Sequence, residues 1–257
     1  MSADPDILLE RLGEVAKVTL NRPDKLNSFT REMILRLPDV LAEAVGGGAR
    51  AIIVTGAGRA FCSGAALGGG PSSGDPGAQL NLYNRFARAM ADLPVPVVTA
   101  VNGAAAGAGA SIALSGDIIL AARSSYLMLA FAKIALVPDM GATWLVAHAV
   151  GRVRALEMAL LGEKMPAEEA HRVGLVTRVV DDEALMPTAE AIANQLAAMP
   201  TRTLGLIRRQ VMRAMEQTFD ESLDLECKHQ AIAAETEDFR EGTTAFREKR
   251  AAKFVGR

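Results

Sequence analysis

The chain has 257 residues, of which half are hydrophobic and 4% aromatic, and its formal net charge is −2. This length can bury a substantial core in one large domain, or in one domain with an extension. The weak charge argues against nucleic acid or an anionic membrane as a partner. Two cysteines are too few for a disulfide framework. The acidic start MSADPD does not resemble a signal peptide, so we expect a cytoplasmic protein.

The first 45 residues predict a hairpin followed by a helix. Two hydrophobic runs, at residues 7–12 and 15–20, flank Gly13-Glu14, which is typical of a β-hairpin. After a polar segment, Thr30 is a candidate N-cap for a helix over residues 30–45. Pro38 should kink or break that helix, because proline has no N–H to donate.

The next segment predicts one buried strand and a long stretch of loop. The strand covers residues 51–55, and the glycine-punctuated segment GAGRAFCSGAAL follows it. Residues 68–77 are rich in Gly, Ser and Pro, so we expect a weakly ordered loop that closes over a bound ligand. Residues 81–93 have a helical pattern.

A central stretch, LPVPVVTAVNGAAAGAGASIALSGD (residues 93–117), has no charged residue before Asp117 and carries the first functional signal. It predicts a buried strand over residues 95–101, a turn at Asn102-Gly103, and a helix entered through Gly107 and Gly109. Small residues allow another molecule to approach the backbone, and the first N–H groups of a helix have no partner within the helix. The stretch therefore predicts an anion-binding hole made of backbone groups.

Three other interpretations of this stretch compete with an anion-binding hole. A membrane span would have a suitable length, but Pro94, Pro96 and Asn102 interrupt it and no basic cluster flanks it. A dinucleotide-binding turn requires a different glycine spacing and a later acidic residue. A tightly packed core helix without any function remains compatible with the pattern.

The remainder predicts further strands and then helices only. Strands are expected over residues 117–122, 126–129 and 175–180, and a loop, FAKIALVPDMGATW, leads into a helix near Ala142. Further helices are expected at 154–161 and 167–173, and then at 183–199, 202–217, 219–234 and 237–249. Helices without strands at the end of a chain indicate a helical extension rather than a second α/β domain.

Four motifs in sequence order resemble the crotonase superfamily, also called the enoyl-CoA hydratase/isomerase family. They are NRPDKLNSF, TGAGRAFCSGAAL, AVNGAAAGAGASIALSGDI and FAKIALVPDMGATW, and the likeness extends over nearly the whole chain. The resemblance implies an α/β fold, the crotonase (ClpP-like) spiral of ββα units in residues 1–198. A C-terminal helical region in residues 199–257 would assemble trimers or hexamers. Two segments, LVPDMGATW and EGTTAFREKR, are most similar to the phenylacetate-pathway branch, the 1,2-epoxyphenylacetyl-CoA isomerases.

The resemblance also implies an acyl-CoA thioester substrate, with no metal and with coenzyme A only as part of the substrate. By motif position, the N–H groups of Ala65 and Ala108 would hold the thioester oxygen, and Asp139 would be the acid/base. Two such donors stabilise an enolate oxygen most strongly in the transition state, where its negative charge develops. Other residues implied to contact substrate are Lys25, Leu26, Ser63, Ala66, Leu67, Gly107, Phe131, Pro138 and Lys253.

Two departures from the family pattern bear on the reaction. Ser111 and Phe131 occupy the places of the two glutamates that hydratases use to activate water, and Ala66 replaces an aspartate near the adenosine. One carboxylate, at Asp139, remains. A single carboxylate can remove a proton from one carbon and return it to another, which is isomerase chemistry.

Structural roles are the alternative for each of these residues. Asp139 could be an N-cap, Ser111 a helix-face hydroxyl and Phe131 pocket wall. A packed thiol at Cys62 and a structural histidine at His148 need no function. Lys25 and Lys253 could be solvated lysines rather than ligands of the coenzyme A phosphates.

The sequence thus favours an acyl-CoA isomerase. The alternatives are an enoyl-CoA hydratase that recruits water through Asp139, a non-catalytic acyl-CoA-binding or assembly subunit, and a serine peptidase built on Ser111.

Overall fold

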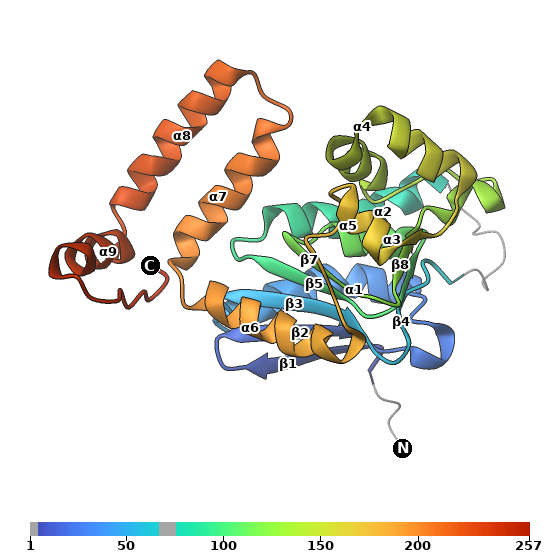
Figure 1. Ribbon diagram of the computed structural model, residues 1–257, viewed down its shortest axis with the longest axis horizontal. Coiled ribbons are helices and arrows are strands. Elements are labelled where there is room, and N and C mark those ends of the chain that lie inside the picture. Colours follow the sequence, from blue (N-terminus) through green and yellow to red (C-terminus); the bar gives the residue numbers. More distant parts are fainter. Residues whose placement is uncertain (1–4, 67–75) are drawn as a thin grey trace.

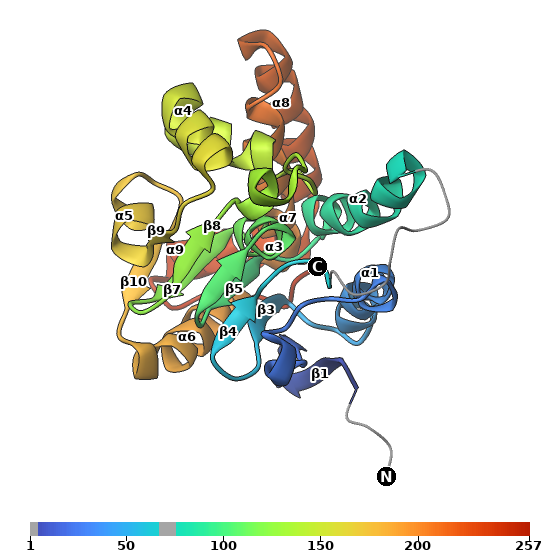
Figure 2. The same cartoon turned by 90° about the vertical axis from the view of Figure 1, so that its right-hand side faces the viewer.

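The computed structural model describes residues 5–66 and 76–257, which form two β-sheets with helices around them and a helical arm (Figures 1 and 2). The larger sheet has the strand order β1-β2-β3-β5-β7-β10. Its strands are β1 (Ile7–Leu12), β2 (Val15–Leu20), β3 (Ala51–Gly56), β5 (Val97–Val101), β7 (Ile118–Ala122) and β10 (Arg178–Val180). The β1–β2 hairpin is antiparallel, as predicted, and the other pairs are parallel.

The smaller sheet has the order β4-β6-β8-β9, built from strands of two or three residues. These are β4 (Ala60–Cys62), β6 (Ala104–Ala106), β8 (Tyr126–Met128) and β9 (Met165–Pro166). Each of the first three directly follows a strand of the larger sheet and precedes a helix. The succession β3-β4-α2, β5-β6-α3 and β7-β8-α4 therefore confirms the predicted spiral of ββα units.

The helices before the arm surround the sheets. They are α1 (Arg31–Gly46), α2 (Pro76–Asp92), α3 (Ala108–Leu114), α4 (Ala142–Leu161), α5 (Ala167–Arg172) and α6 (Leu185–Ala197), with 3-10 turns η1 (Pro23–Lys25), η2 (Ala130–Ile134) and η3 (Asp182–Ala184). Thr30 caps α1 as predicted, by accepting a hydrogen bond from the Met33 N–H. The helix runs across Pro38 rather than breaking there. In contrast, α4 is interrupted at Gly151, whose backbone is not helical.

Alternation along β3 places one hydrophobic cluster on each face of the larger sheet. Ile52 and Val54 belong to the main core, whereas Ala51 and Ile53 pack with α6 in a second cluster. A strand with both faces covered has apolar residues at every position, which explains the unbroken hydrophobic run of β3. The sheet is thus buried on both sides, and the ends of its strands carry the loops of the candidate site.

The C-terminal arm consists of α7 (Thr201–Ala214), α8 (Phe219–Ala234) and α9 (Glu237–Glu248). Figure 1 shows α7 and α8 side by side and projecting away from the sheets. Many apolar side chains of the arm are exposed, including Val211 of α7 at 60% and Phe246 of α9 at 86%. The proposed division of the chain at residue 198 falls between α6 and α7 and stays a prediction. Among the described helices, none has the length and apolar character needed to cross a bilayer.

Two sequence expectations need correction or fall outside the structure. The segment after β3 was expected to be a loop, but it contains strand β4, which pairs with β6. A helix was expected after the Asn102-Gly103 turn, but strand β6 comes first and the helix follows it. The proposed lid, residues 68–77, lies almost entirely outside the described residues, as does Leu67.

Candidate active site

Ala65 lies in a segment that pairs with the chain at Phe29. In this parallel bridge, the Phe29 N–H donates to the Gly64 carbonyl at 3.0 Å and the Ala66 N–H donates to the Phe29 carbonyl at 2.9 Å. Phe29 thus bonds to the Gly64 carbonyl and to the Ala66 N–H, which flank Ala65 in the sequence. The N–H of Ala65 itself points away from Phe29. Among the described residues, no backbone acceptor meets that N–H. Ala65 therefore has an N–H group available to a ligand, and its role toward substrate stays a prediction.

Ala108 presents the second donor, at the start of α3. Gly107 is the N-cap, with φ of 54°, and its N–H donates to the Met128 carbonyl at 2.8 Å. The N–H of Ala108 begins the helix, so it has no acceptor one turn earlier, and the described residues provide none elsewhere. The Ala108 N–H is available because Ala108 is the first residue of α3.

Glycine contacts bring the two donors together. A Cβ atom on Gly64, which has φ of +97°, would lie 3.5 Å from the Ala108 nitrogen and 3.0 Å from the Ala106 oxygen. A Cβ atom on Gly109 would lie only 2.1 Å from the Cys62 oxygen. Both positions thus require glycine, one for its backbone conformation and close packing, the other for packing alone. The glycines therefore allow the segment before Ala65 to lie close to the start of α3.

The loop NRPDKLNSF supports the Ala65 segment from outside. Asn27 is buried at φ of 54°, and its side chain accepts from the Arg22 N–H at 2.8 Å and donates to the Ala57 and Ala60 carbonyls at 2.8 and 2.7 Å. The Leu26 carbonyl accepts from the Ser63 N–H at 3.0 Å. Leu26 and Ser63 are therefore adjacent, on the flank of the two donors.

Asp139 reaches the site from the loop before α4. Its carbonyl accepts from the Ser111 hydroxyl at 3.1 Å, which places the residue beside α3, one turn beyond Ala108. Burial raises the pKa of the Asp139 carboxyl from 3.8 to about 6, although a hydrogen bond with its own backbone opposes the rise. Oδ1 is buried without a hydrogen-bond partner among the described residues. The helix begins after Gly141 with no side-chain cap, so Asp139 is not its N-cap.

A cavity of about 250 Å³ lies next to this loop. Met140, Gly141 and Trp144 line one side, and residues of α2, the end of α3 and α7 line the rest. Its walls are mainly apolar, with the Asp117–Arg208 ion pair on one side. The cavity adjoins Asp139 only through the neighbouring residue Met140, because Asp139, Ala108 and Ala65 are not among its lining residues. Its apolar walls suit an uncharged group.

Comparisons with known proteins identify the family of this chain. A family model described as enoyl-CoA hydratase/isomerase matches residues 10–257. The chain belongs to the enoyl-CoA hydratase/isomerase family. An Escherichia coli (strain K12) protein named 1,2-epoxyphenylacetyl-CoA isomerase is 45% identical over 250 residues, which span 95% of each chain. A Rhodobacter capsulatus protein named "Probable enoyl-CoA hydratase" is 41% identical over 250 residues, again 95% of each chain.

Solved structures of the family share the fold. The crystal structure of an enoyl-CoA hydratase from Bacillus anthracis matches with a TM-score of 0.92 at 28% identity, covering 98% of this chain and 100% of that one. The crotonase fold predicted from the motifs is therefore confirmed, and acyl-CoA chemistry is the common ground of these relatives. Neither the family nor the names distinguish isomerase from hydratase for this chain.

The other family positions predicted to touch substrate are distributed unevenly. Pro138 precedes Asp139 and is partly buried, and Ala66 is exposed beside Ala65. Phe131 is buried in the main hydrophobic cluster. Lys25 is exposed in η1. Lys253 is exposed in the tail after α9, where its backbone N–H donates to Glu241 at 2.8 Å. Their roles toward substrate stay predictions.

The residues given structural roles behave accordingly in this family member. Burial raises the pKa of the Cys62 thiol to about 12, so the reactive thiolate is strongly disfavoured. The His148 ring hydrogen-bonds the Trp144 carbonyl at 2.8 Å and packs on the Trp144 ring. Ser111, in contrast, is fully buried and bound to the Asp139 carbonyl, a contact that its position in the sequence does not indicate. No three His, Cys, Asp or Glu side chains cluster as metal ligands within the described residues.

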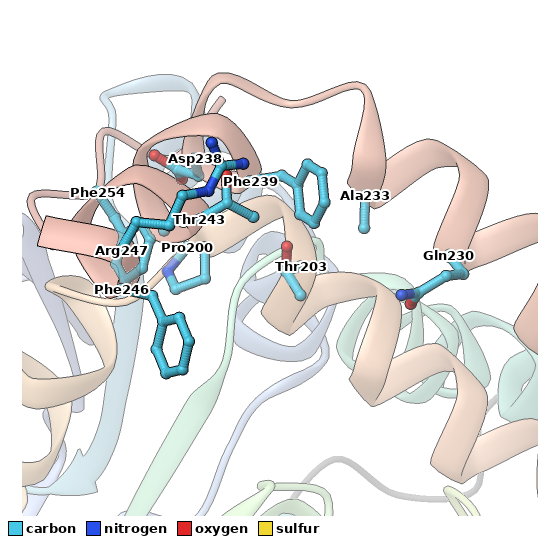
Figure 3. A pocket seen from close by; sticks show the side chains of 11 residues that line it. Pro200, Thr203, Gln230, Ala233, Asp238, Phe239, Thr243, Phe246, Arg247 and Phe254 are labelled. Carbon is cyan, nitrogen blue, oxygen red and sulfur yellow. The ribbon is translucent and has the colours of Figure 1, made fainter. Parts of the chain in front are cut away.

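A larger cavity, of about 600 Å³, lies in the C-terminal arm (Figure 3). It is bordered by α7, α8, α9 and the tail, and Figure 3 shows the aromatic rings of Phe239, Phe246 and Phe254 around it. None of the candidate catalytic residues lines this space. All of its lining residues belong to the arm and the segments next to it, whereas Ala65, Ala108 and Asp139 lie in the spiral, so its size does not make it the active site.

Proposed function

We propose that this protein is an acyl-CoA isomerase. The observation that carries the proposal is the single carboxyl group of Asp139, partly buried and with pKa raised to about 6, beside a helix that starts with a free N–H. The position where hydratases of the family carry one glutamate holds Ser111, whose hydroxyl binds backbone, and the other holds the buried ring of Phe131. One acid/base group supports proton transfer between carbons better than activation of water.

In the proposed reaction, the thioester oxygen accepts hydrogen bonds from the N–H groups of Ala65 and Ala108. Asp139 as carboxylate removes a proton from the carbon next to the thioester carbonyl, and the electron pair moves onto the oxygen as an enolate. The two donors stabilise that charge, by about 3 kcal/mol per donor in comparable sites. The protonated carboxyl then returns the proton to a different carbon. A group with pKa near 6 can both accept and return a proton near neutral pH.

The acyl group would occupy the cavity lined by Met140 and Trp144. Its volume, about 250 Å³, lies below the roughly 300–1,000 Å³ of sites for drug-sized ligands. We therefore infer a short or ring-bearing acyl group, with coenzyme A outside this cavity. The 45% identity to the Escherichia coli isomerase supports a phenylacetyl-derived ring.

A second candidate is an enoyl-CoA hydratase, favoured by the 41% identity to the Rhodobacter capsulatus protein. Incubation with a panel of thioesters, including 1,2-epoxyphenylacetyl-CoA, 3-enoyl-CoA and 2-enoyl-CoA species, followed by mass spectrometry, separates the two. Isomerisation leaves the mass unchanged and alters the spectrum, whereas hydration adds one water. Hydration of 2-enoyl-CoA without isomerisation of any member would overturn the proposal. Tight binding without turnover would indicate the non-catalytic role.

We also propose that the chain assembles into a trimer or a dimer of trimers. The support is the exposed apolar surface of the arm, which soluble proteins rarely leave open to water.

A further inference from the structure

Ser111 connects the two halves of the candidate site. Its side chain is 0% exposed, and its Oγ donates to the Asp139 carbonyl oxygen at 3.1 Å. The contact bridges α3 and the loop before α4, which are 28 residues apart in sequence. The first turn of α3 therefore holds both the Ala108 N–H and, three residues later, the Ser111 hydroxyl that binds the Asp139 carbonyl.

The Asp139 carbonyl is held from a second side, where it accepts from the Ala142 N–H at 3.0 Å. Between Asp139 and Ala142 the backbone turns sharply, with φ of 50° at Met140 and 84° at Gly141. A non-glycine residue in the left-handed region persists only where its surroundings fix it. Met140 is 2% exposed and Ala142 is fully buried, so the turn is held by packing and by the two hydrogen bonds.

The carboxyl group of Asp139 has little support of its own. Oδ1 is buried and finds no hydrogen-bond partner among the described residues. The carboxyl group bonds only within its own residue, so its position follows from the conformation of the Asp139 backbone. The backbone of Asp139 is in turn fixed by Ser111 and Ala142.

We propose that Ser111 is a positioning residue, whose hydroxyl fixes the Asp139 carboxyl relative to the Ala108 N–H. This role rests on the proposed isomerase function, because it matters only if Asp139 transfers the proton. It gives a function to the serine that occupies a glutamate position of the family's hydratases. The serine acts through the backbone of Asp139 and has no contact with the reacting atoms.

Ser111→Ala tests the proposal, measured on the thioester that the wild-type protein converts fastest. The Asp139 carbonyl keeps its bond from Ala142, so the variant leaves no acceptor without a partner. We expect kcat to fall about 10- to 100-fold, since a misplacement of about 1 Å can cost a factor near 100, with KM within about twofold of wild type. Ser111→Cys keeps the volume and a weak donor, so it should lie between the two and serves if the alanine variant fails to fold.

A second readout needs no substrate. The pKa of Asp139, about 6 in the intact site, can be followed by NMR titration of its carboxyl carbon. In Ser111→Ala the released carboxyl meets water, so its pKa should fall toward 3.8. Thr99→Val is the matched control, because Thr99 is equally buried and its Oγ1 donates to the Ala113 carbonyl of α3 at 2.8 Å. This control should lose stability while kcat and the pKa of Asp139 stay unchanged.

Asp139→Asn separates the possible failures. If Asp139→Asn loses turnover while Ser111→Ala keeps both kcat and the pKa of Asp139, the positioning role is wrong and the isomerase proposal stands. If Asp139→Asn keeps turnover, the proposed function is wrong, and the positioning role with it. Equal losses of kcat in Ser111→Ala and Thr99→Val would also overturn the positioning role, since they would indicate general destabilisation.

Discussion

The guanidinium of Arg208, on α7, lies 2.6 Å from the carboxylate of Asp117, which follows α3 in the spiral. The Arg208 side chain is only 8% exposed, and it also donates to the Met90 carbonyl at 3.1 Å and to the Leu93 carbonyl. Asp117 in turn accepts from the Val97 N–H at 2.7 Å. Burial raises the pKa of Asp117, and the charge and hydrogen bond of Arg208 counteract this rise. One arginine thus ties the base of the C-terminal arm to α2, β5 and the wall of the candidate acyl cavity.

We expect Arg208→Ala to lower the free energy of unfolding by about 2 kcal/mol, because it leaves a partly exposed carboxylate and two carbonyls without this partner. Arg213→Ala, on the same helix, removes only an exposed contact with Glu216 and should cost less than about 0.5 kcal/mol. Urea denaturation of both variants at one protein concentration measures the difference. Equal losses would contradict a special role for Arg208.

A second prediction concerns the packing that brings Ala65 and Ala108 together. A Cβ on Gly109 would lie 2.1 Å from the Cys62 oxygen, so Gly109→Ala must push β4 away from α3. We expect a loss of about 2 kcal/mol or more in stability and a loss of thioester turnover. Gly46→Ala is the control, since nothing lies within 4 Å of its Cβ position. It should be neutral or stabilise by up to about 1 kcal/mol, because Gly46 is helical. Thermal unfolding and turnover of a Gly109→Ala variant that matched wild type would refute the packing argument.

The sequence predicted the five longer strands of the larger sheet because they are mainly apolar runs of five or six residues, whereas the strand expected over residues 175–180 is limited to Arg178–Val180. The hairpin at residues 7–12 and 15–20 has the bounds expected. The strand predicted at 51–55 is one residue longer in the structure, where it ends at Gly56. Of the smaller sheet, only β8 was expected, as a strand over residues 126–129. Its other strands, such as AFC in β4 and AAA in β6, are too short to show a period, and their pairing depends on contacts between segments far apart in the chain.

The candidate site was predictable only in part, for a related reason. Ala65, Ala108 and Asp139 occupy recognisable motifs, so a resemblance could point to them. The bond from Ser111 to Asp139 depends on how α3 packs against the loop before α4, and no spacing in the sequence indicates it. Likewise, Arg208 and Asp117 are 91 residues apart, and nothing around Arg208 distinguishes it from Arg209.

Assembly of the arm gives a third prediction. Light scattering should find a trimer or hexamer at micromolar concentration, with the apolar residues of α7 buried between copies. Val211 is 60% exposed in the single chain, and Val211→Asp should shift the protein toward monomer because it would bury an unpaired charge. Val211→Thr keeps the shape without the charge and should assemble. A wild-type monomer, or a Val211→Asp variant that assembles as well as wild type, would contradict the proposed assembly.

Asp139 gives the last prediction, in which activity and stability change in opposite directions. As a base it must be ionised, so kcat/KM should fall about tenfold per pH unit below its pKa, which is about 6. Asp139→Asn keeps the shape and removes the base, so turnover should fall about 100- to 10,000-fold. The two effects report the same group.

Stability should respond with the opposite sign. The pKa is raised from 3.8 in the unfolded chain to about 6 in the folded one, so the folded state binds the proton more tightly between these values. Its stability therefore decreases as the pH rises through this window, and above pH 6 the ionised carboxyl carries the full cost of burial. Asparagine has no such cost. We expect Asp139→Asn to melt at a higher temperature than wild type at pH 7.5, and the difference to shrink as the pH falls toward 4. A variant that keeps near-native turnover, or that melts below wild type at pH 7.5, would mean that Asp139 is structural rather than the proton acceptor.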